Sequence, residues 1–492
     1  MKKAIIIGSG IAGIAASIRL AVQGYDVHVF EKNDYPGGKL SSFEKNGYRF
    51  DAGPSLFTQP QNIEELFTLA NEPIKDYFQY QEVDIVCHYF FENGIQLNTY
   101  ADREKLAQEF QSKLGERPES VKKYLSKAET LYDNIGEIFL NHSLHLSKTW
   151  LHKRVLSALA NVKMPYLFNS LHQYNSTQFK SKEAVQIFNR FATYNGSNPY
   201  KAPAMLSLIP HLEQNQGTFY PKGGMINITN ALYKLALKKG VQFHFNHSVE
   251  KIVHEEGTAK GIFTNGELVS ADLIVSNGDV YYTYKNLLQN PSKIKTLEKL
   301  ERSSSALIFY WGIKKEFSPL GLHNILFSEK YDVEFDHLFN KKTLFNDPTI
   351  YINITSKMEA NQAPDGCENW FVMINAPTNI GQDWSKMIQD AKQHIIQKIN
   401  RILKTDIESF IETEEVLNPV TIEQKTGTYQ GSLYGTSSNS KFAAFFRPSN
   451  FSSEINGLYF CGGTVHPGGG IPLCLKSAYI TTELIKKKYA RD

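Results

Sequence analysis

Ala4-Ile5-Ile6-Ile7-Gly8-Ser9-Gly10-Ile11-Ala12-Gly13 is the stretch of sequence that decides the fold of this chain. Its first four residues are an apolar run that predicts a buried strand, and a helix-like segment follows the glycines as far as Gly24. A second predicted strand, Asp26–Phe30, then ends on Glu31. Strand, glycine turn, helix, strand and acid in this order form the dinucleotide-binding fingerprint of a βαβ unit. The alternative is an ordinary βαβ unit without a ligand, but context, spacing and terminal acid all agree with a binding site.

Each part of this fingerprint has a physical reason. Gly8 allows a tight turn, Gly10 lets the backbone approach a pyrophosphate, and Gly13 lets helix and strand pack closely. The helix N-terminus then presents free N–H groups and a partial positive charge to the phosphates. At the end of the second predicted strand, the Glu31 carboxylate can accept hydrogen bonds from both hydroxyls of a ribose. Because a 2′-phosphate would meet a like charge there, the pattern disfavours NADP.

Composition bounds the remaining possibilities. A length of 492 residues predicts two or more domains. The formal net charge of +3, without an arginine-rich tract, gives no electrostatic reason to expect a nucleic-acid partner. The 31 Phe and 26 Tyr residues suit a large core or a long apolar binding tunnel, and composition alone does not choose between them.

The cysteines and the apolar runs indicate a cellular compartment. The four cysteines form no C-x-x-C motif and no metal-ligand spacing, which suits a reducing cytoplasm. The sequence begins directly with a predicted strand, so we expect no signal peptide. No apolar run reaches the length that spans a bilayer. These features predict a cytoplasmic protein without a metal centre.

A second glycine turn lies near the end of the chain. The apolar run Leu458–Cys461 leads into Gly462-Gly463-Thr464, and a helix-like segment follows Pro472. One chain with such a turn at both ends indicates one extended ligand that is held from two sides.

The segment 148–168 has the pattern of a basic amphipathic helix. Apolar residues recur at helical spacing, basic residues lie between them, and aromatic residues lie near the ends. Such a helix can lie in a membrane interface. The alternative is a packed surface helix with a solvated face, which the segment alone favours.

The two glycine turns resemble those of the FAD-containing amine-oxidase superfamily, and the chain as a whole resembles the bacterial-type carotenoid (phytoene) desaturases. The resemblance rests on the fingerprint with Glu31, Gly37-Gly38-Lys39, Gly53-Pro54, Tyr220–Met225, His323–Ser328 and His466–Pro472. Within that family, Asp51–Ser55 and Asn195–Pro203 look most like the 1-hydroxycarotenoid 3,4-desaturases. Phytoene-type members more often carry a methionine at the position of Ala52.

This resemblance implies an α/β fold. It predicts a Rossmann-like FAD-binding domain built from discontinuous segments, and a substrate domain with a mixed sheet and a helical, membrane-facing subdomain. The expected bounds are 1–75, 216–289 and 441–492 for the FAD-binding domain, and 76–215 and 290–440 for the substrate domain, with the helical subdomain at 115–192.

The resemblance also implies which residues contact FAD. The fingerprint would hold the pyrophosphate, Glu31 the adenosine ribose, and Lys39 the phosphate and ribityl arm. Val249 would pair its backbone with adenine, and 463–472 would run beside the ribityl chain and isoalloxazine. The full expected set is Gly8, Ser9, Gly10, Ile11, Ala12, Gly13, Glu31, Lys32, Gly38, Lys39, Gly53, Pro54, Ser55, Val249, Asn277, Gly463, Thr464, Gly470, Ile471 and Pro472.

The implied activity is FAD-dependent insertion of a C3–C4 double bond into a 1-hydroxycarotenoid, such as 1′-hydroxy-γ-carotene, by hydride transfer to flavin N5. This chemistry requires no triad, metal or carboxylate pair, and the sequence assigns no catalytic residue. His466 is expected to have a structural or cofactor-packing role. A substrate this apolar comes from lipid, which predicts peripheral attachment to the cytoplasmic membrane.

Three alternatives stay open. The first is a desaturase of phytoene or diapophytoene, and the second is an amine or porphyrinogen oxidase on the same scaffold. The third is a non-enzymatic carrier like the dissociation inhibitors of prenylated GTPases, which the intact glycines and Glu31 oppose.

Overall fold

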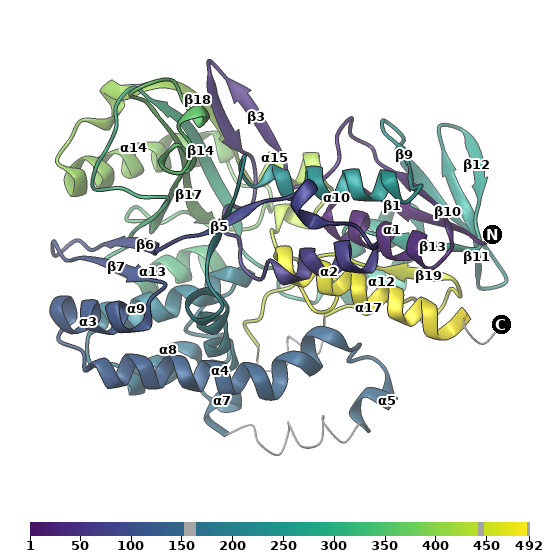
Figure 1. Cartoon of the computed structure of the whole chain (residues 1–492), viewed down its shortest axis with the longest axis horizontal. Coiled ribbons are helices and arrows are strands. Elements are labelled where there is room, and N and C mark those ends of the chain that lie inside the picture. The colour runs from purple at the N-terminus through teal and green to yellow at the C-terminus, as the bar shows by residue number, and fades with distance from the viewer. Residues whose placement is uncertain (152–163, 441–446, 490–492) are drawn as a thin grey trace.

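The apolar run at the N-terminus forms the central strand of a parallel sheet. In the computed structural model, which describes residues 1–151, 164–440 and 447–489, five strands pair in the order β19-β13-β1-β2-β9 (Figure 1). Ile5 of β1 lies opposite Ile274 on one side and His28 on the other. The strands are β1 (Lys3–Ile7), β2 (Asp26–Phe30), β9 (Gln242–His244), β13 (Leu273–Ser276) and β19 (Leu458–Phe460).

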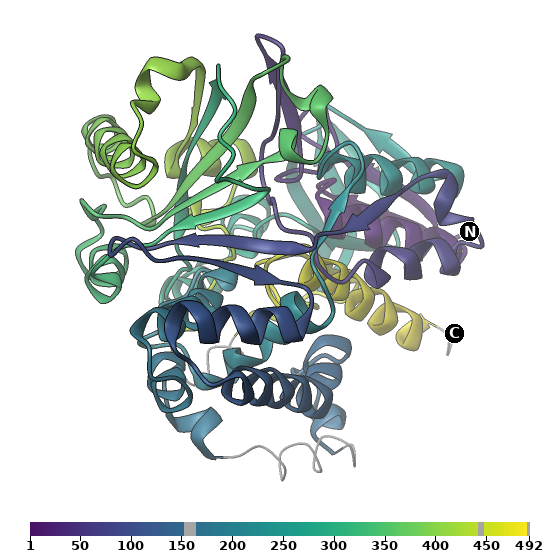
Figure 2. The same cartoon turned by 60° about the vertical axis from the view of Figure 1, so that its left-hand side comes forward.

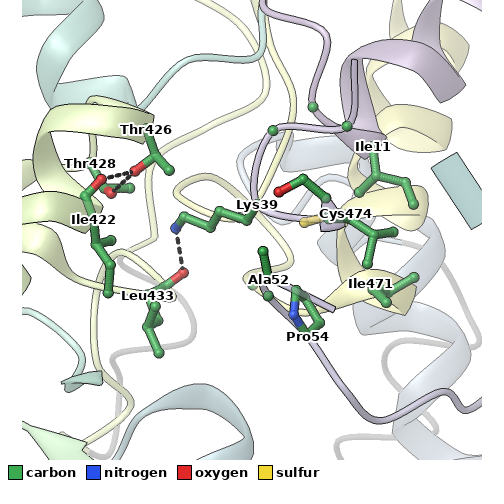
Figure 3. Close-up of a pocket in the computed structure, with 18 of the residues that line it drawn as sticks. Ile11, Lys39, Ala52, Pro54, Ile422, Thr426, Thr428, Leu433, Ile471 and Cys474 are labelled. Atoms are coloured by element: carbon green, nitrogen blue, oxygen red, sulfur yellow. Dashed lines mark hydrogen bonds between the residues drawn. The ribbon is translucent and has the colours of Figure 1, made fainter. Parts of the chain in front are cut away.

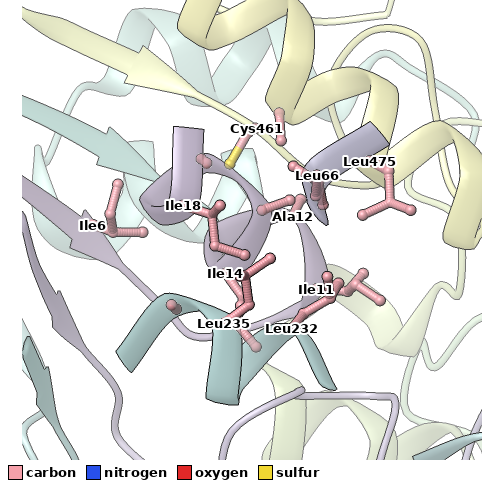
Figure 4. Close-up of a cluster of buried hydrophobic side chains, with 14 of the residues drawn as sticks. Ile6, Ile11, Ala12, Ile14, Ile18, Leu66, Leu232, Leu235, Cys461 and Leu475 are labelled. Atoms are coloured by element: carbon pink, nitrogen blue, oxygen red, sulfur yellow. The ribbon is translucent and has the colours of Figure 1, made fainter. Parts of the chain in front are cut away.

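Helix α1 (Ile11–Val22) packs on one face of this sheet. Figure 4 shows Ile14 and Ile18 of α1 with Ile6 of β1 and Leu235 of a neighbouring helix. The helices in this layer are α1, α2 (Gln61–Leu69), α10 (Ile226–Lys238) and α17 (Ile471–Tyr489). Gly13 is required here, because a Cβ on it would lie 2.2 Å from the Gly8 carbonyl oxygen.

The opposite face of the parallel sheet is covered by an antiparallel three-stranded sheet. Ile5 and Ile7 point to this side, as the alternation of a strand requires, and pack with Ile252 and Ile262. The predicted hairpin at Asn265-Gly266 joins two of these strands. The elements are β10 (Val249–Glu255), β11 (Thr258–Thr264), β12 (Glu267–Ser270), α11 (Val280–Tyr282) and α12 (Pro291–Glu298).

A second large sheet has seven strands in the order β18-β14-β17-β16-β15-β6-β7. The sheet is mixed, since β15 pairs with β6 in parallel and all other neighbouring strands of the sheet pair antiparallel. Helix α14 (Trp384–Leu403) covers one face through Ile395 and Ile399. The strands are β6 (Ile85–Phe90), β7 (Gln96–Tyr100), β14 (Ser305–Ile313), β15 (His323–Leu326), β16 (Ile350–Ile354), β17 (Glu368–Ala376) and β18 (Ile411–Leu417).

A helical layer lies against the β6–β7 end of this sheet, as both views show (Figures 1 and 2). Its helices are α3 (Arg103–Leu114), α4 (Pro118–Asn141), α7 (Met164–Phe168), α8 (Leu171–Gln178) and α9 (Lys182–Asn189). The short helix α5 (Ser147–Trp150) follows α4 and lies away from this end of the sheet (Figure 1). The predicted amphipathic helix at 148–168 falls largely on 152–163, outside the described residues.

The remaining elements connect these layers. They are the hairpin β3 (Ser42–Lys45) and β4 (Tyr48–Asp51), the pair β5 (Tyr80–Glu82) and β8 (Phe219–Pro221), and the helices α13 (Tyr331–Asp336) and α15 (Pro419–Thr426). No helix within the described ranges is long and apolar enough to cross a membrane.

The predicted α/β class with a parallel sheet and a mixed sheet is confirmed. The parallel sheet takes its strands from 1–75, 216–289 and 441–492, which supports the division into domains. The domain bounds themselves stay a prediction, as does the membrane-facing role of the helical layer.

Candidate cofactor and substrate site

One cavity of about 910 Å³ connects the two large sheets. It begins at the glycine turn after β1 and reaches residues of the seven-stranded sheet and of the helical layer. Its volume is at the upper end of the usual range for ligand pockets, so it has room for an elongated ligand. Figure 3 shows part of its lining, with Ile11 and Ile471 on one side and Leu433 on the other.

The N-terminus of α1 opens onto this cavity at Gly10 and Ile11. No side chain caps the helix, so its first amide groups have no capping side-chain acceptor. A Cβ on Gly10 would lie 2.6 Å from Asn277 Oδ1, and one on Gly38 would lie 3.4 Å from the Gly10 Cα. The glycines therefore keep this turn narrow enough for a ligand to approach the backbone, which suits a pyrophosphate.

Glu31, at the end of β2, is buried and lines the cavity. Its Oε2 accepts hydrogen bonds from the Ser9 amide at 2.8 Å and from Ser9 Oγ at 2.9 Å. Its Oε1 accepts from the Asn33 amide at 3.0 Å and from Asn33 Nδ2 at 2.9 Å. Since a carboxylate has about four acceptor positions, a ribose here must share or displace one of these contacts.

Lys39 extends a cationic group into the middle of the cavity. Its Nζ donates to the Leu433 carbonyl oxygen at 2.9 Å, and it forms no ion pair with any described residue. Burial lowers the pKa of Lys39, while Asp279 and Cys474 act in the opposite direction. An ammonium with three donors and one protein acceptor is suited to a phosphate oxygen.

The second glycine turn lies on the same cavity. Helix α17 starts at Ile471, and a Cβ on Gly470 would meet no atom within 4 Å, so space is open above this turn. Thr464 Oγ accepts a hydrogen bond from the Val280 amide at 3.1 Å, which joins this turn to α11. Two helix N-termini, those of α1 and α17, therefore line one cavity, and both favour negative charge.

All the residues predicted to contact FAD line this cavity except Ser9 and Gly13. Ser9 instead holds Glu31, and Gly13 permits the close contact of α1 with the turn. The nucleotide roles of the others stay a prediction. The donor set fits FAD in this structure, since open helix N-termini, a lysine without an ion pair and a buried carboxylate all border one cavity.

The part of the cavity between the seven-stranded sheet and the helical layer contains a buried ion pair that the sequence did not indicate. Arg190 donates to both carboxylate oxygens of Glu213 at 3.1 and 3.3 Å, and Tyr194 hydrogen-bonds the same carboxylate. The guanidinium lies 5.1–5.5 Å from the ring centres of Tyr89, Phe191 and Tyr194. Arg190 and Glu213 lie outside the sequence motifs that predict the cofactor site. The only sequence signal for this ion pair is a charged residue among apolar ones.

His466 does not line the cavity. It is fully buried, its Nε2 contacts the His142 carbonyl oxygen at 3.0 Å, and burial lowers its pKa to about 3. This environment supports the predicted structural role. Among the described residues, no group of His, Cys, Asp or Glu is arranged to hold a metal ion.

Two stretches that pointed to hydroxylated carotenoids have structural roles as well. Asp51 accepts hydrogen bonds from the amides of Met225 and Ile226, so it caps α10, and it pairs with Arg49. Residues 195–203 form hydrogen bonds with residues 438–439 and do not line the cavity. Only Ala52–Ser55 of the two stretches reaches the ligand space.

Comparison with known proteins gives a family and close relatives. The profile of flavin-containing amine oxidoreductases matches residues 11–485. The chain is 50% identical to the 1-hydroxycarotenoid 3,4-desaturase of Flavobacterium sp. (strain P99-3), over 99% of each chain. It is 33% identical to the 4,4′-diapolycopene oxygenase of Methylomonas sp., over 100% of this chain and 98% of that one.

Solved structures show the same fold at low sequence identity. A triple mutant of putrescine oxidase has a TM-score of 0.64 at 13% identity, with 99% of each chain covered. Cyclohexylamine oxidase from Brevibacterium oxydans IH-35A has a TM-score of 0.62 at 14% identity, with 100% of each chain covered.

Proposed function

Because the chain belongs to the family of flavin-containing amine oxidoreductases, we propose that it is an FAD-dependent desaturase that inserts the C3–C4 double bond of a 1-hydroxycarotenoid. The observation that carries this substrate is the 50% identity to a protein of that name over 99% of both chains. The relatives named as oxygenases of diapocarotenoids are 32–33% identical, so they support the proposal less directly.

The cavity supports the proposal through its shape and lining. Beyond the cofactor motifs it is lined by apolar and aromatic side chains of the seven-stranded sheet, among them Ile308, Tyr310, Ile325, Phe371 and Met373. Such a lining buries a polyene and excludes water from the reacting carbons. Bound FAD supplies the two-electron acceptor for the hydrogen that leaves the substrate.

The protein itself then contributes to the reaction mainly by positioning the substrate. Rigid strands β14, β15 and β17 hold one wall of the cavity, and Gly53-Pro54 joins this wall to the cofactor turn at Lys39. Holding a reacting carbon against a fixed acceptor removes much of the entropic barrier to the reaction. The proton that leaves is adjacent to a developing positive charge and is therefore acidic, so water or a weak base suffices to take it.

Peripheral membrane binding is a second part of the proposal. Leu151, Met164 and Phe168, which flank the segment outside the described residues, are 77%, 63% and 55% exposed. Apolar side chains at such exposure beside exposed Lys148 suit an interface between lipid and water. The predicted site of action is the cytoplasmic face of the membrane, where the substrate is dissolved.

Pigment analysis tests the substrate. The gene is expressed in bacteria that accumulate a 1-hydroxycarotenoid, in others that accumulate lycopene or γ-carotene, and in others that accumulate phytoene. We expect one added double bond, and a single red shift in absorption, only in the hydroxylated background. Stepwise conversion of phytoene to lycopene would instead identify a phytoene desaturase, and an oxygenated end group without a new double bond would identify an oxygenase.

Vesicle binding tests the membrane part. Changing Lys148, Lys153 and Arg154 to glutamate removes about 1 kcal/mol of attraction per basic residue at an anionic surface. Co-sedimentation with vesicles of phosphatidylcholine and phosphatidylserine should therefore fall sharply for this triple variant.

A matched control has the same charge change at exposed lysines of other elements. Lys251, Lys260 and Lys299 are exposed and lie on β10, β11 and at the end of α12. Their change to glutamate should leave most of the vesicle binding. Equal loss in both triple variants would mean that net charge alone, and not this segment, governs binding.

A further inference from the structure

Three hydrogen-bonded polar groups lie in the part of the cavity that the seven-stranded sheet lines. His323 of β15, Tyr351 of β16 and Ser55 all border the cavity, and a chain of hydrogen bonds connects them. Tyr351 Oη lies 2.8 Å from His323 Nδ1 and 2.8 Å from Ser55 Oγ. The inner residue, His323, is only 3% exposed. Polar groups at such depth need hydrogen-bond partners.

The hydrogen-bond partners of His323 fix its tautomer. Asn353 Nδ2 lies 3.0 Å from the Leu322 carbonyl oxygen, so this atom of the amide is the donor nitrogen. The same nitrogen lies 3.2 Å from His323 Nδ1, which must therefore accept. A neutral imidazole that accepts at Nδ1 carries its hydrogen on Nε2. Burial lowers the pKa of His323 to about 3, with Arg190 and His88 acting in the same direction, so the ring is neutral at physiological pH.

The Nε2–H of His323 is then a donor without an acceptor. No described residue accepts a hydrogen bond from it. A buried donor that stays unpaired is costly, and a ligand oxygen relieves this cost when it binds. His323 borders the cavity, but its Nε2 atom has almost no accessible surface, so a ligand oxygen reaches it when a neighbouring side chain moves aside. Arg190 Nε also has no partner, but its guanidinium lies among three aromatic rings and is paired with Glu213.

We propose that His323 Nε2–H donates a hydrogen bond to the hydroxyl oxygen of the substrate end group and so selects hydroxylated carotenoids. This inference rests on the proposed function and adds to it the residue that reads the hydroxyl. Tyr351 and Asn353 are positioning residues, because they hold Nδ1 as an acceptor and keep the hydrogen on Nε2.

The location of His323 agrees with the chemistry of the substrate. The hydroxyl is on C1, a near neighbour of C3 and C4 along the chain, so its binding group must lie near the reacting carbons. The chain of hydrogen bonds from His323 ends at Ser55, which directly follows Gly53-Pro54. A Cβ on Gly53 would lie 1.8 Å from the Lys39 carbonyl oxygen, so this turn touches the cofactor part of the cavity.

The test compares two substrates in the FAD-loaded enzyme. The kcat/KM ratio between a 1-hydroxycarotenoid and its analogue without the hydroxyl is measured for wild type, His323→Phe and His323→Gln. The phenyl ring has no donor, and we expect the ratio to fall roughly tenfold to a hundredfold, mainly through the hydroxylated substrate. The glutamine amide can place an N–H near the position of Nε2 and should restore part of the ratio.

A matched control separates recognition from loss of a buried hydrogen bond. Tyr124 is fully buried outside the cavity, and its hydroxyl donates to Asn175 Oδ1 at 2.8 Å. Tyr124→Phe should lower stability and leave the substrate ratio unchanged. FAD content and melting temperature are recorded for every variant.

Each outcome has one meaning. If wild type converts the hydroxylated substrate and His323→Phe keeps the full ratio, this inference is overturned and the proposed function stands. If wild type converts no 1-hydroxycarotenoid, the proposed function itself fails. Should His323→Phe not fold, His323→Leu decides, because its side chain also lacks a donor and should lower the ratio to the same extent; an unchanged ratio overturns the inference.

Discussion

Changing Lys39 to methionine tests the cofactor site most directly. Lys39 is half-buried in the cavity between the two glycine turns, and its ammonium donates a hydrogen bond to the Leu433 carbonyl oxygen. Methionine has a similar length and no charge. The variant therefore removes the cation that we assign to the phosphate and leaves the shape of the cavity almost unchanged.

The size of the effect follows from the kind of bond that is lost. A hydrogen bond to a charged group contributes roughly 1.5–3 kcal/mol, and each 1.4 kcal/mol is tenfold in Kd. The Kd for FAD should therefore rise roughly 10- to 150-fold in Lys39→Met. Lys39→Arg keeps the charge and should lose less.

The same structure predicts an opposite effect on the protein without cofactor. Because burial lowers the pKa of Lys39, the unfolded chain binds this proton more tightly than the folded chain does. The charge thus destabilises the cofactor-free protein at neutral pH, and this effect disappears as the pH rises toward the ordinary pKa of 10.5. Lys39→Met without FAD should melt at the same temperature as wild type or higher.

Fluorescence titration of cofactor-free protein with FAD measures the Kd, and thermal melting with and without FAD measures the stability. Lys392→Met is the control, since Lys392 pairs with Glu414 and does not line the cavity. If Lys39→Met binds FAD as tightly as wild type, the lysine is not at a phosphate. If its cofactor-free form melts well below wild type, the loss of binding reflects damage to the fold.

Two further predictions concern stability. Gly13→Ala should lower the melting temperature and give protein without flavin, because the new Cβ lies 2.2 Å from the Gly8 carbonyl oxygen and forces the glycine turn and α1 apart; normal flavin content would refute this packing argument. Glu334→Gln should stabilise the protein by roughly 2–3 kcal/mol at pH 8 and hardly at all at pH 4.5. Burial raises the pKa of Glu334 from 4.5 to about 7, so the wild-type folded state loses stability as the pH rises through that interval, and glutamine removes this loss. Thermal melting across this pH range checks it, and a parallel pH dependence in both proteins would contradict it.

The sequence predicted the cofactor half of the molecule because its signals are local. Strand, turn, helix and strand lie within the first thirty-one residues, and the structure has β1, α1 and β2 where the pattern placed them. The physical constraint at Gly13 is also local, since the clash is with Gly8 of the same turn. The hairpin at Asn265-Gly266 follows from the same kind of short-range rule.

The substrate half could not be predicted in the same way, because its groups meet only after folding. Arg190 and Glu213 lie in helical segments, while His323 and Tyr351 lie on neighbouring strands. His323 belongs to a stretch that carries the family resemblance, yet nothing in that stretch shows that its Nδ1 accepts from Asn353. The tautomer, and with it the free donor, is a property of the assembled sheet.

The charges in the cavity also bear on the alternatives that the sequence left open. An amine oxidase binds a substrate with a cationic nitrogen, and a buried carboxylate is the group that would attract it. Here Glu213 is already neutralised by Arg190, and the neighbouring donor at His323 presents a hydrogen. The neutralised carboxylate does not attract a cation, and the N–H donor favours an oxygen atom. Phytoene and its C30 analogue have no oxygen, so they would leave that donor unpaired, and a cavity with this arrangement is suited to a hydroxylated polyene.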